Sequence, residues 1–170
     1  MENEARRLER KERMRRKDRE RDEEFALEVI DSAPYGVLAL TDENGEPYCI
    51  QLSLVRVGKE LFFHSAHEGR KADIIRKNPK ACLAFADNVL PAMDQFTTGY
   101  DSAIVKGIVS EIKDDTEKIE ALRKISERYC PTNMVRFDEA IKSSLHRCAI
   151  FKISMDEITG KQKKLSPGGY

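Results

Sequence analysis

The residues best suited to chemistry lie in one stretch, FFHSAHEGRKADIIRKNP, at positions 62–79. Its apolar start predicts a buried strand that ends at His64, and Gly69 precedes a short helix. The first N–H groups of such a helix lack backbone partners and carry the positive end of the helix dipole. Three polar side chains share this turn: Ser65, Arg70 and Lys71. Together these groups would favour a phosphate monoester, although a solvated helix start would show the same residue types.

A metal site is the alternative use of this stretch. His64 and His67 could join two later residues, His146 and Cys148, as four ligands. The first pair lacks the i, i+4 spacing that places two ligands on one helix face, and the second pair is remote in sequence. The pattern therefore predicts no metal site. The four cysteines include no Cys-x-x-Cys pair, so we expect reduced, mostly buried thiols and a cytoplasmic protein.

The sequence predicts several strands separated by closely spaced turns, and these strands would position the turn between His64 and Lys71. Asn44-Gly45 is the strongest hairpin signal and pairs residues 35–41 with residues 47–57. Further strands are predicted over 60–66, 80–87, 101–112 and 148–160, with a loop over 88–100 and helices over 25–32, 70–78, 114–130 and 138–145. Gly107 inside a strand indicates a bend or a close backbone approach. About six strands, with helices at the start and between the later strands, predict an α+β fold built on an antiparallel β-barrel.

Charge is concentrated in the first 24 residues, of which ten are Lys or Arg and nine are Asp or Glu. Acid-before-base pairs at i, i+4 predict a solvated helical extension over residues 1–24. An arm that binds RNA or a partner is the alternative. Acidic residues interleave with the basic ones, and 30 basic residues balance 30 acidic residues in the chain, so nucleic-acid binding is not expected. The longest apolar run, residues 81–86, is too short to span a membrane.

Four motifs occur in a characteristic order: PYGVLALTDENGEPYCIQLSLV, ELFFHSAHEGRKADIIRKNPKACLAF, FTTGYDSAIVKGIVSEI and CAIFKISMDEITGKQ. In this order they resemble the FMN-binding split β-barrel proteins related to pyridoxamine 5′-phosphate oxidase, and within them the nitroimidazole-resistance (Nim-type) reductases. The resemblance runs from about Arg15 to Gln162. It implies a six-stranded antiparallel Greek-key split β-barrel with flanking helices over residues 25–170. Such proteins form homodimers with FMN in two clefts at the subunit interface.

The resemblance also implies which residues bind the cofactor. The backbone of the second hairpin strand would face the flavin ring, at Gln51, Leu52 and Ser53. The strand end and helix start would hold the ribityl chain and phosphate, through His64, Ser65, Arg70 and Lys71. Residues of the other chain would close the site: Thr97, Thr98 and Ser102.

His64 has two interpretations within this resemblance. An imidazole beside a flavin could protonate a reduced substrate, and Nim-type proteins commonly place a histidine at the equivalent strand end. It could equally be a hydrogen-bonding residue of the pocket wall. His64 is therefore a candidate catalytic acid.

The predicted function is an FMN-dependent oxidoreductase that takes electrons from NAD(P)H or another donor. Its acceptor would be a small electron-poor molecule such as a nitroimidazole or other nitroaromatic. The C-terminal sequence EITGKQKKLSPGGY contains no Arg, unlike the arginine-rich substrate-binding end of pyridoxamine-phosphate oxidases proper, so oxidation of pyridoxine phosphate is not expected. The alternative is a flavin-binding sensor or storage protein whose charged arm recruits a partner.

Overall fold

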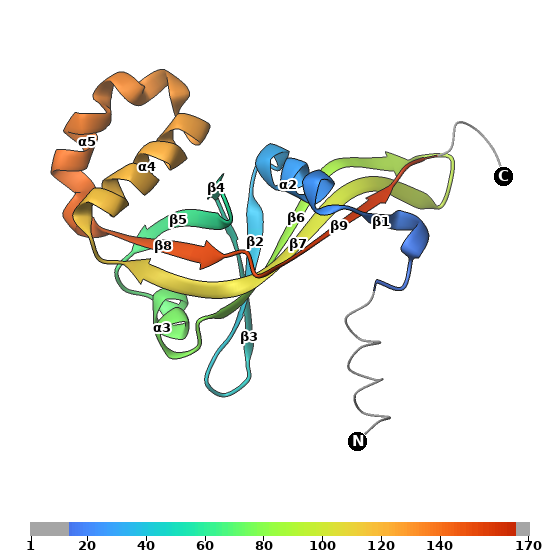
Figure 1. Cartoon of the computed structure of the whole chain (residues 1–170), viewed down its shortest axis with the longest axis horizontal. Helices are drawn as coiled ribbons and strands as arrows, with labels where there is room; N and C mark the ends of the chain where they lie inside the picture. The colour runs from blue at the N-terminus through green and yellow to red at the C-terminus, as the bar shows by residue number, and fades with distance from the viewer. Residues whose placement is uncertain (1–13, 166–170) are drawn as a thin grey trace.

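A nine-stranded antiparallel sheet dominates the computed structural model, which describes residues 14–165 (Figure 1). The hydrogen-bonded order is β3-β2-β6-β7-β8-β5-β4, and β9 pairs with both β7 and β1. Within the described residues β3 and β4 do not pair with each other, so the sheet is open. The strands are β1 (Glu20–Arg21), β2 (Gly36–Thr41), β3 (Pro47–Leu52), β4 (Val55–Val57), β5 (Glu60–Ala66), β6 (Lys80–Ala92), β7 (Thr97–Ile112), β8 (Cys148–Ser154) and β9 (Glu157–Lys163).

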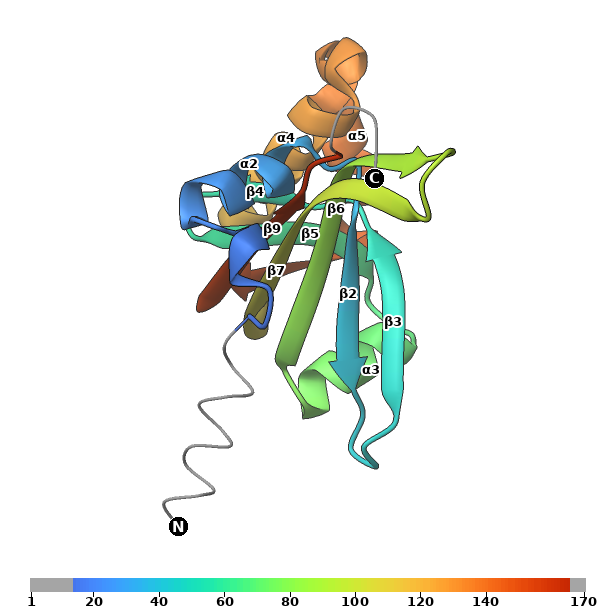
Figure 2. The same cartoon turned by 90° about the vertical axis from the view of Figure 1, so that its right-hand side faces the viewer.

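The four α-helices lie at different places around this sheet. They are α2 (Glu23–Ser32), α3 (Arg70–Lys77), α4 (Asp115–Tyr129) and α5 (Phe137–Ser144), with short 3₁₀ turns η1 (Lys17–Arg19), η2 (Pro131–Arg136) and η3 (Leu145–Arg147). Helices α4 and α5 gather at one end beside β5 and β8, whereas the hairpin of β6 and β7 extends with β9 toward the other end (Figures 1 and 2). The fold therefore has one end capped by α4 and α5 and another end built mainly of strands, with η1 beside them.

Apolar residues that alternate along the strands form the core. The buried faces of β2, β5, β6, β7 and β8 pack together with α2 and α3, and the rings of Phe63 and Phe151 stack with centroids 5.2 Å apart. A second cluster beneath α4 contains Phe62, Ile112, Ala121, Ile125 and Ile150. Burial of these side chains, each contributing about 1.5–3 kcal/mol, fixes β5 between the two clusters and so fixes the strand end at His64.

The predicted hairpin at Asn44-Gly45 is confirmed for β2 and β3, but the second strand stops at Leu52 and residues 55–57 form β4, which pairs with β5 instead. Gly45 has φ 85°, which glycine adopts without strain, and the Asp42 carboxylate accepts hydrogen bonds from the backbone N–H groups of Asn44 and Glu46, both at 2.9 Å. Gly107 also behaves as predicted. A Cβ there would lie 1.7 Å from the Ser154 carbonyl oxygen, so two backbones approach closely at this point.

The structure corrects several expectations. The prediction of an antiparallel sheet with flanking helices is confirmed. Residues 14–165 form nine strands in all, and the six-stranded Greek-key core within them stays a prediction. Residues 88–100 are mostly strand, because β6 and β7 resume pairing after a register shift between Asp87 and Leu90. The single strand expected over 148–160 is two strands, β8 and β9, with different partners. The thiols are free, as expected, but they are not mostly buried, since Cys49 and Cys130 are exposed.

The charged extension predicted over residues 1–24 falls partly outside the described residues, which begin at Met14. In the described part the chain forms the 3₁₀ turn η1 and the two-residue strand β1 rather than an α-helix. Strand β1 is antiparallel to β9, with Glu20 opposite Lys161 and Arg21 opposite Gly160. No helix in the described part of the chain is long and apolar enough to cross a membrane.

Candidate functional site

The turn from β5 into α3 has the geometry of an open anion site. Gly69 precedes the helix with φ 118°, a left-handed conformation that favours glycine. No described side chain caps the N-terminus of α3, so the first N–H groups of the helix have no side-chain acceptor. A negatively charged group at this point would complete their hydrogen bonding.

Two cations flank this helix start. The Cζ atom of Arg70 lies 5.0 Å from the ring centroid of Tyr48, and the Nζ atom of Lys71 lies 5.3 Å from that of Phe63. Within residues 14–165 neither cation forms an ion pair. Lys71 is half-buried, and burial lowers the pKa of its ammonium group. A half-buried cation without a carboxylate partner is costly, so an anionic ligand at this turn would stabilise it.

His64 lies on β5, two residues before the strand ends at Ala66. His64 is exposed on β5, and the partial desolvation of its imidazole, followed by the positive charge of Lys71, lowers the pKa of His64. His67 contacts other residues. Its Nε2 atom lies 3.2 Å from the His146 carbonyl oxygen, and its carbonyl oxygen accepts a hydrogen bond from Arg76 at 2.9 Å. Among the residues that the structure describes, no group of three or more His, Cys, Asp or Glu side chains is arranged to hold a metal ion.

A cavity of about 390 Å³ opens beside His64. Ser53 and His64 contribute polar groups from the sheet, and α4 and α5 contribute a mostly apolar wall that includes Leu122, Ile125, Tyr129, Phe137, Ala140 and Ile141. Sequence reasoning missed this cavity. The signal was present in the apolar faces of the two helices, but nothing in the sequence showed that both faces would meet over the end of β5.

The predicted residues of β3 lie on an edge strand. Among the described residues β3 pairs with β2 alone, so the backbone along its other edge is open. Gln51 sits opposite Val37 in register, and Ser53 follows the strand end and lines the cavity with His64. The structure thus brings Ser53 and His64 to one cavity, and Ser65, Arg70 and Lys71 to the adjoining turn.

The remaining predicted residues lie elsewhere in the same chain. Thr97, Thr98 and Ser102 belong to the part of β7 that extends with β6 away from α4 and α5 (Figure 1). They do not line the cavity beside His64. The family resemblance implies that they close the site of a second chain, and this stays a prediction.

A family model described as pyridoxamine 5′-phosphate oxidase matches residues 22–162. Among solved structures, a candidate 5-nitroimidazole antibiotic resistance protein from Bacteroides thetaiotaomicron has a TM-score of 0.70 at 24% identity, over 83% of this chain and 84% of its own. The flavocytochrome Anf3 from Azotobacter vinelandii has a TM-score of 0.77 at 20% identity, over 93% and 75%.

A further structure, the FAD and heme binding protein from Mycobacterium smegmatis, has a TM-score of 0.71 at 20% identity, over 84% of this chain and 71% of its own. At these identities the structural likenesses show a shared fold. No curated protein matches the chain.

Proposed function

This chain belongs to the pyridoxamine 5′-phosphate oxidase family, and we propose that it is a cytoplasmic, homodimeric, FMN-dependent oxidoreductase built on a six-stranded Greek-key barrel core. The observation that carries the proposal is the half-buried Lys71, unpaired within residues 14–165, beside the uncapped start of α3. A bound phosphate group would pair with the Lys71 ammonium and also accept hydrogen bonds from the first N–H groups of α3. The flavin would supply the redox chemistry, and the protein would bind and orient it.

The residues present fit a flavin phosphate. Arg70 and Lys71 offer charge-assisted donors, Ser65 offers a hydroxyl, and the α3 backbone offers free N–H groups. The open edge of β3 at Gln51 and Leu52 offers backbone groups that would pair with the polar edge of a ring. These are the residues that sequence analysis assigned to the cofactor, and the proposal keeps them.

A second copy of the chain is part of the proposal because one face of the sheet is apolar but uncovered. Gln51, Val37, Ala84 and Ile104 form one row across β3, β2, β6 and β7. The residues next to Val37, Ala84 and Ile104 on the same strands, namely Leu38, Leu83 and Val105, point into the core. Ser102 shares the outer face with Ile104. If the same face of a second copy covered this one, Thr97, Thr98 and Ser102 would approach the partner's edge strand β3 near Gln51.

The tip of the β6–β7 hairpin supports the same arrangement. Met93 and Phe96 are almost completely exposed, at 95% and 103%. Large apolar side chains gain about 1.5–3 kcal/mol on full burial, so contact with a second chain would stabilise the pair. The loop position would also place them at the border of the cleft.

The cavity beside His64 would take the electron acceptor. Its apolar helical wall suits a small flat molecule, and the Ser53 and His64 side chains would orient a polar substituent such as a nitro group. His64 would deliver a proton from its imidazole. The lowered pKa leaves this ring largely neutral at pH 7, and a phosphate bound beside Lys71 would offset the charge that contributes to the shift.

A non-catalytic role in flavin binding or storage is the second candidate. In that role His64 would only line the cavity wall with Ser53, and it would deliver no proton. The similar structures include a flavocytochrome and a FAD and heme binding protein. Binding of a flavin is therefore the property that both candidate functions share.

The test is to purify the protein, record its visible spectrum and titrate the apoprotein with FMN. Loaded protein would then be mixed anaerobically with NADH or NADPH, and bleaching followed before and after addition of a nitroimidazole. Flavin absorbance, reduction and reoxidation coupled to loss of the nitro chromophore would support the enzyme. Flavin binding without such turnover would favour the storage role, and a colourless protein that titrates with no flavin would overturn both.

A further inference from the structure

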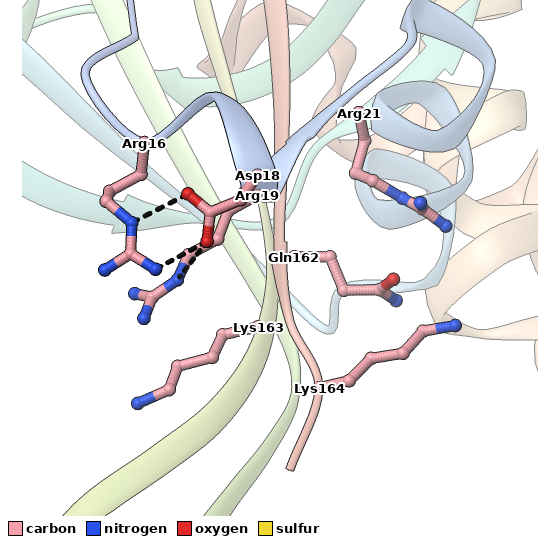
Figure 3. A pocket seen from close by; sticks show the side chains of 7 residues that line it. All are labelled: Arg16, Asp18, Arg19, Arg21, Gln162, Lys163 and Lys164. Atoms are coloured by element: carbon pink, nitrogen blue, oxygen red, sulfur yellow. Dashed lines mark hydrogen bonds and ion pairs between the residues drawn. The ribbon is translucent and has the colours of Figure 1, made fainter. Parts of the chain in front are cut away.

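A basic pocket lies at the end of the fold opposite α4 and α5. It has a volume of about 390 Å³ and is lined by residues of η1, β1 and the end of β9 (Figure 3). Five of its lining residues are cations: Arg16, Arg19, Arg21, Lys163 and Lys164. One lining residue is acidic, Asp18. We call this site the β9 pocket.

The acidic residue does not neutralise the β9 pocket. The Asp18 carboxylate accepts a hydrogen bond from Arg16 Nε at 2.7 Å. It also lies 3.9 Å from Arg19 Nε. The Arg16 hydrogen bond, the largest cause, holds the pKa of Asp18 down at about 2. Within residues 14–165, Arg21, Lys163 and Lys164 form no ion pair. The pocket therefore keeps a surplus of positive charge in a concave space.

The cations divide between the two sides of β9. Figure 3 shows Arg16, Arg19 and Lys163 on one side of the strand, and Arg21, Gln162 and Lys164 on the other. Lys163 is opposite Tyr100 in register, and Lys161 is opposite Ser102. Residues opposite each other in an antiparallel pair point to the same face. Lys163 therefore shares a face with Tyr100 and Ser102, the face that continues into the uncovered apolar surface of the sheet.

We propose that the β9 pocket binds the diphosphate group of a dinucleotide. The inference rests on the proposed function in one respect: if Ser102 borders the flavin cleft of a second chain, as proposed, then Lys163, which lies on the same face of the sheet, would stand near that cleft. Two kinds of dinucleotide contain such a diphosphate: a nicotinamide dinucleotide as electron donor, or FAD in place of FMN. In either case Arg19 and Lys163 would contact the diphosphate oxygens.

A nucleic acid fits this surface less well. Binding along a polynucleotide requires several phosphate contacts spread over a basic surface, and the chain as a whole carries no net charge. The acidic residue Glu20 lies on β1 between the lining residues Arg19 and Arg21, opposite Lys161 in register. The positive region is thus confined to a concave space suited to one or two phosphate groups.

Titration calorimetry with inorganic pyrophosphate, inorganic phosphate and ADP on the full chain tests the pocket without any flavin. Pyrophosphate and ADP should bind more tightly than phosphate, with affinity that falls as NaCl is raised. Arg19→Ala and Lys163→Ala should each weaken pyrophosphate by about tenfold, and Lys163→Arg should retain binding. Lys142→Ala, an exposed lysine on α5, is the control. No pyrophosphate binding, or binding that Arg19→Ala and Lys163→Ala leave unchanged, would overturn the proposal.

Two further measurements identify the source of the diphosphate. If the source is FAD, Lys163→Ala should weaken FAD but not FMN. If it is the electron donor, the variant should raise the KM for the nicotinamide nucleotide and leave FMN affinity unchanged. Pyrophosphate binding with neither effect would overturn the assignment to a dinucleotide. Protein that binds FMN but not pyrophosphate would refute the pocket alone, whereas pyrophosphate binding without flavin binding would refute the proposed function.

Discussion

The hydroxyl of Tyr129 on α4 bridges both backbone groups of Leu54. It accepts a hydrogen bond from the Leu54 N–H at 3.1 Å and donates one to the Leu54 carbonyl at 2.8 Å. Leu54 is fully buried and follows Ser53 directly. One side chain of the helical end therefore fixes the chain between β3 and β4, and with it the sheet side of the cavity beside His64.

Tyr129→Phe should destabilise the protein by about 1–3 kcal/mol, because it leaves two partly buried backbone groups without this partner. Urea unfolding followed by circular dichroism would measure the change, with Tyr35→Phe, whose side chain is 51% exposed, as the matched control. The flavin affinity of the variant should fall as Ser53 loses its fixed position. Equal unfolding midpoints for the two variants would argue against the bridge.

Lys71→Ala should weaken FMN binding by about 1.5–3 kcal/mol, the contribution of a hydrogen bond to a charged group. The matched control is Lys77→Ala on the same helix, since Lys77 lies at the other end and pairs with Glu43 at 2.7 Å. Quenching of flavin fluorescence would give both dissociation constants. Wild-type FMN affinity in Lys71→Ala would show that the phosphate does not bind at this turn.

Sequence reasoning succeeds where a local signal determines the structure. Asn44-Gly45 specifies a hairpin by its own backbone preferences, and Gly107 marks a close approach because a glycine in a strand has few other causes. It fails at Leu90, where pairing resumes after a bulge, because register there depends on β7 rather than on residues 88–92 themselves. The same limit applies to the site. The turn at Gly69 to Lys71 is local and was predicted, whereas the cavity requires α4 and α5 to pack over β5.

His64 should make stability depend on pH. Since its folded pKa lies below the ordinary value of 6.5, the unfolded chain takes up the proton first as pH falls. The contribution of this residue is therefore complete above about pH 6.5 and is lost as pH falls from there through the folded pKa. His64→Gln should reduce the difference in unfolding free energy between pH 7.5 and pH 5.5, with His146→Gln as the control. An unchanged difference would show that His64 titrates normally.

Gly107→Ala should destabilise the protein by at least about 3 kcal/mol, because the added Cβ would overlap the Ser154 backbone and force β7 and the end of β8 apart. Ser110→Ala, an exposed position on the same strand, is the comparison. Thermal unfolding would show a large drop in Tm for the first variant and little change for the second. A tolerated alanine at Gly107 would mean that the two strands are not this close.

Ala84→Arg should convert a dimer into a monomer. Ala84 is exposed in the middle of the row that joins Gln51, Val37 and Ile104, so a charged side chain there would be buried without a partner if a second copy covers the face. Light scattering coupled to size-exclusion chromatography would compare it with Val135→Arg, which replaces an apolar side chain that is 92% exposed on η2. The wild type and Val135→Arg should elute as dimers with bound flavin, and Ala84→Arg as a monomer with weakened flavin binding. A monomeric wild type, or a dimer that survives Ala84→Arg, would place the interface on another surface.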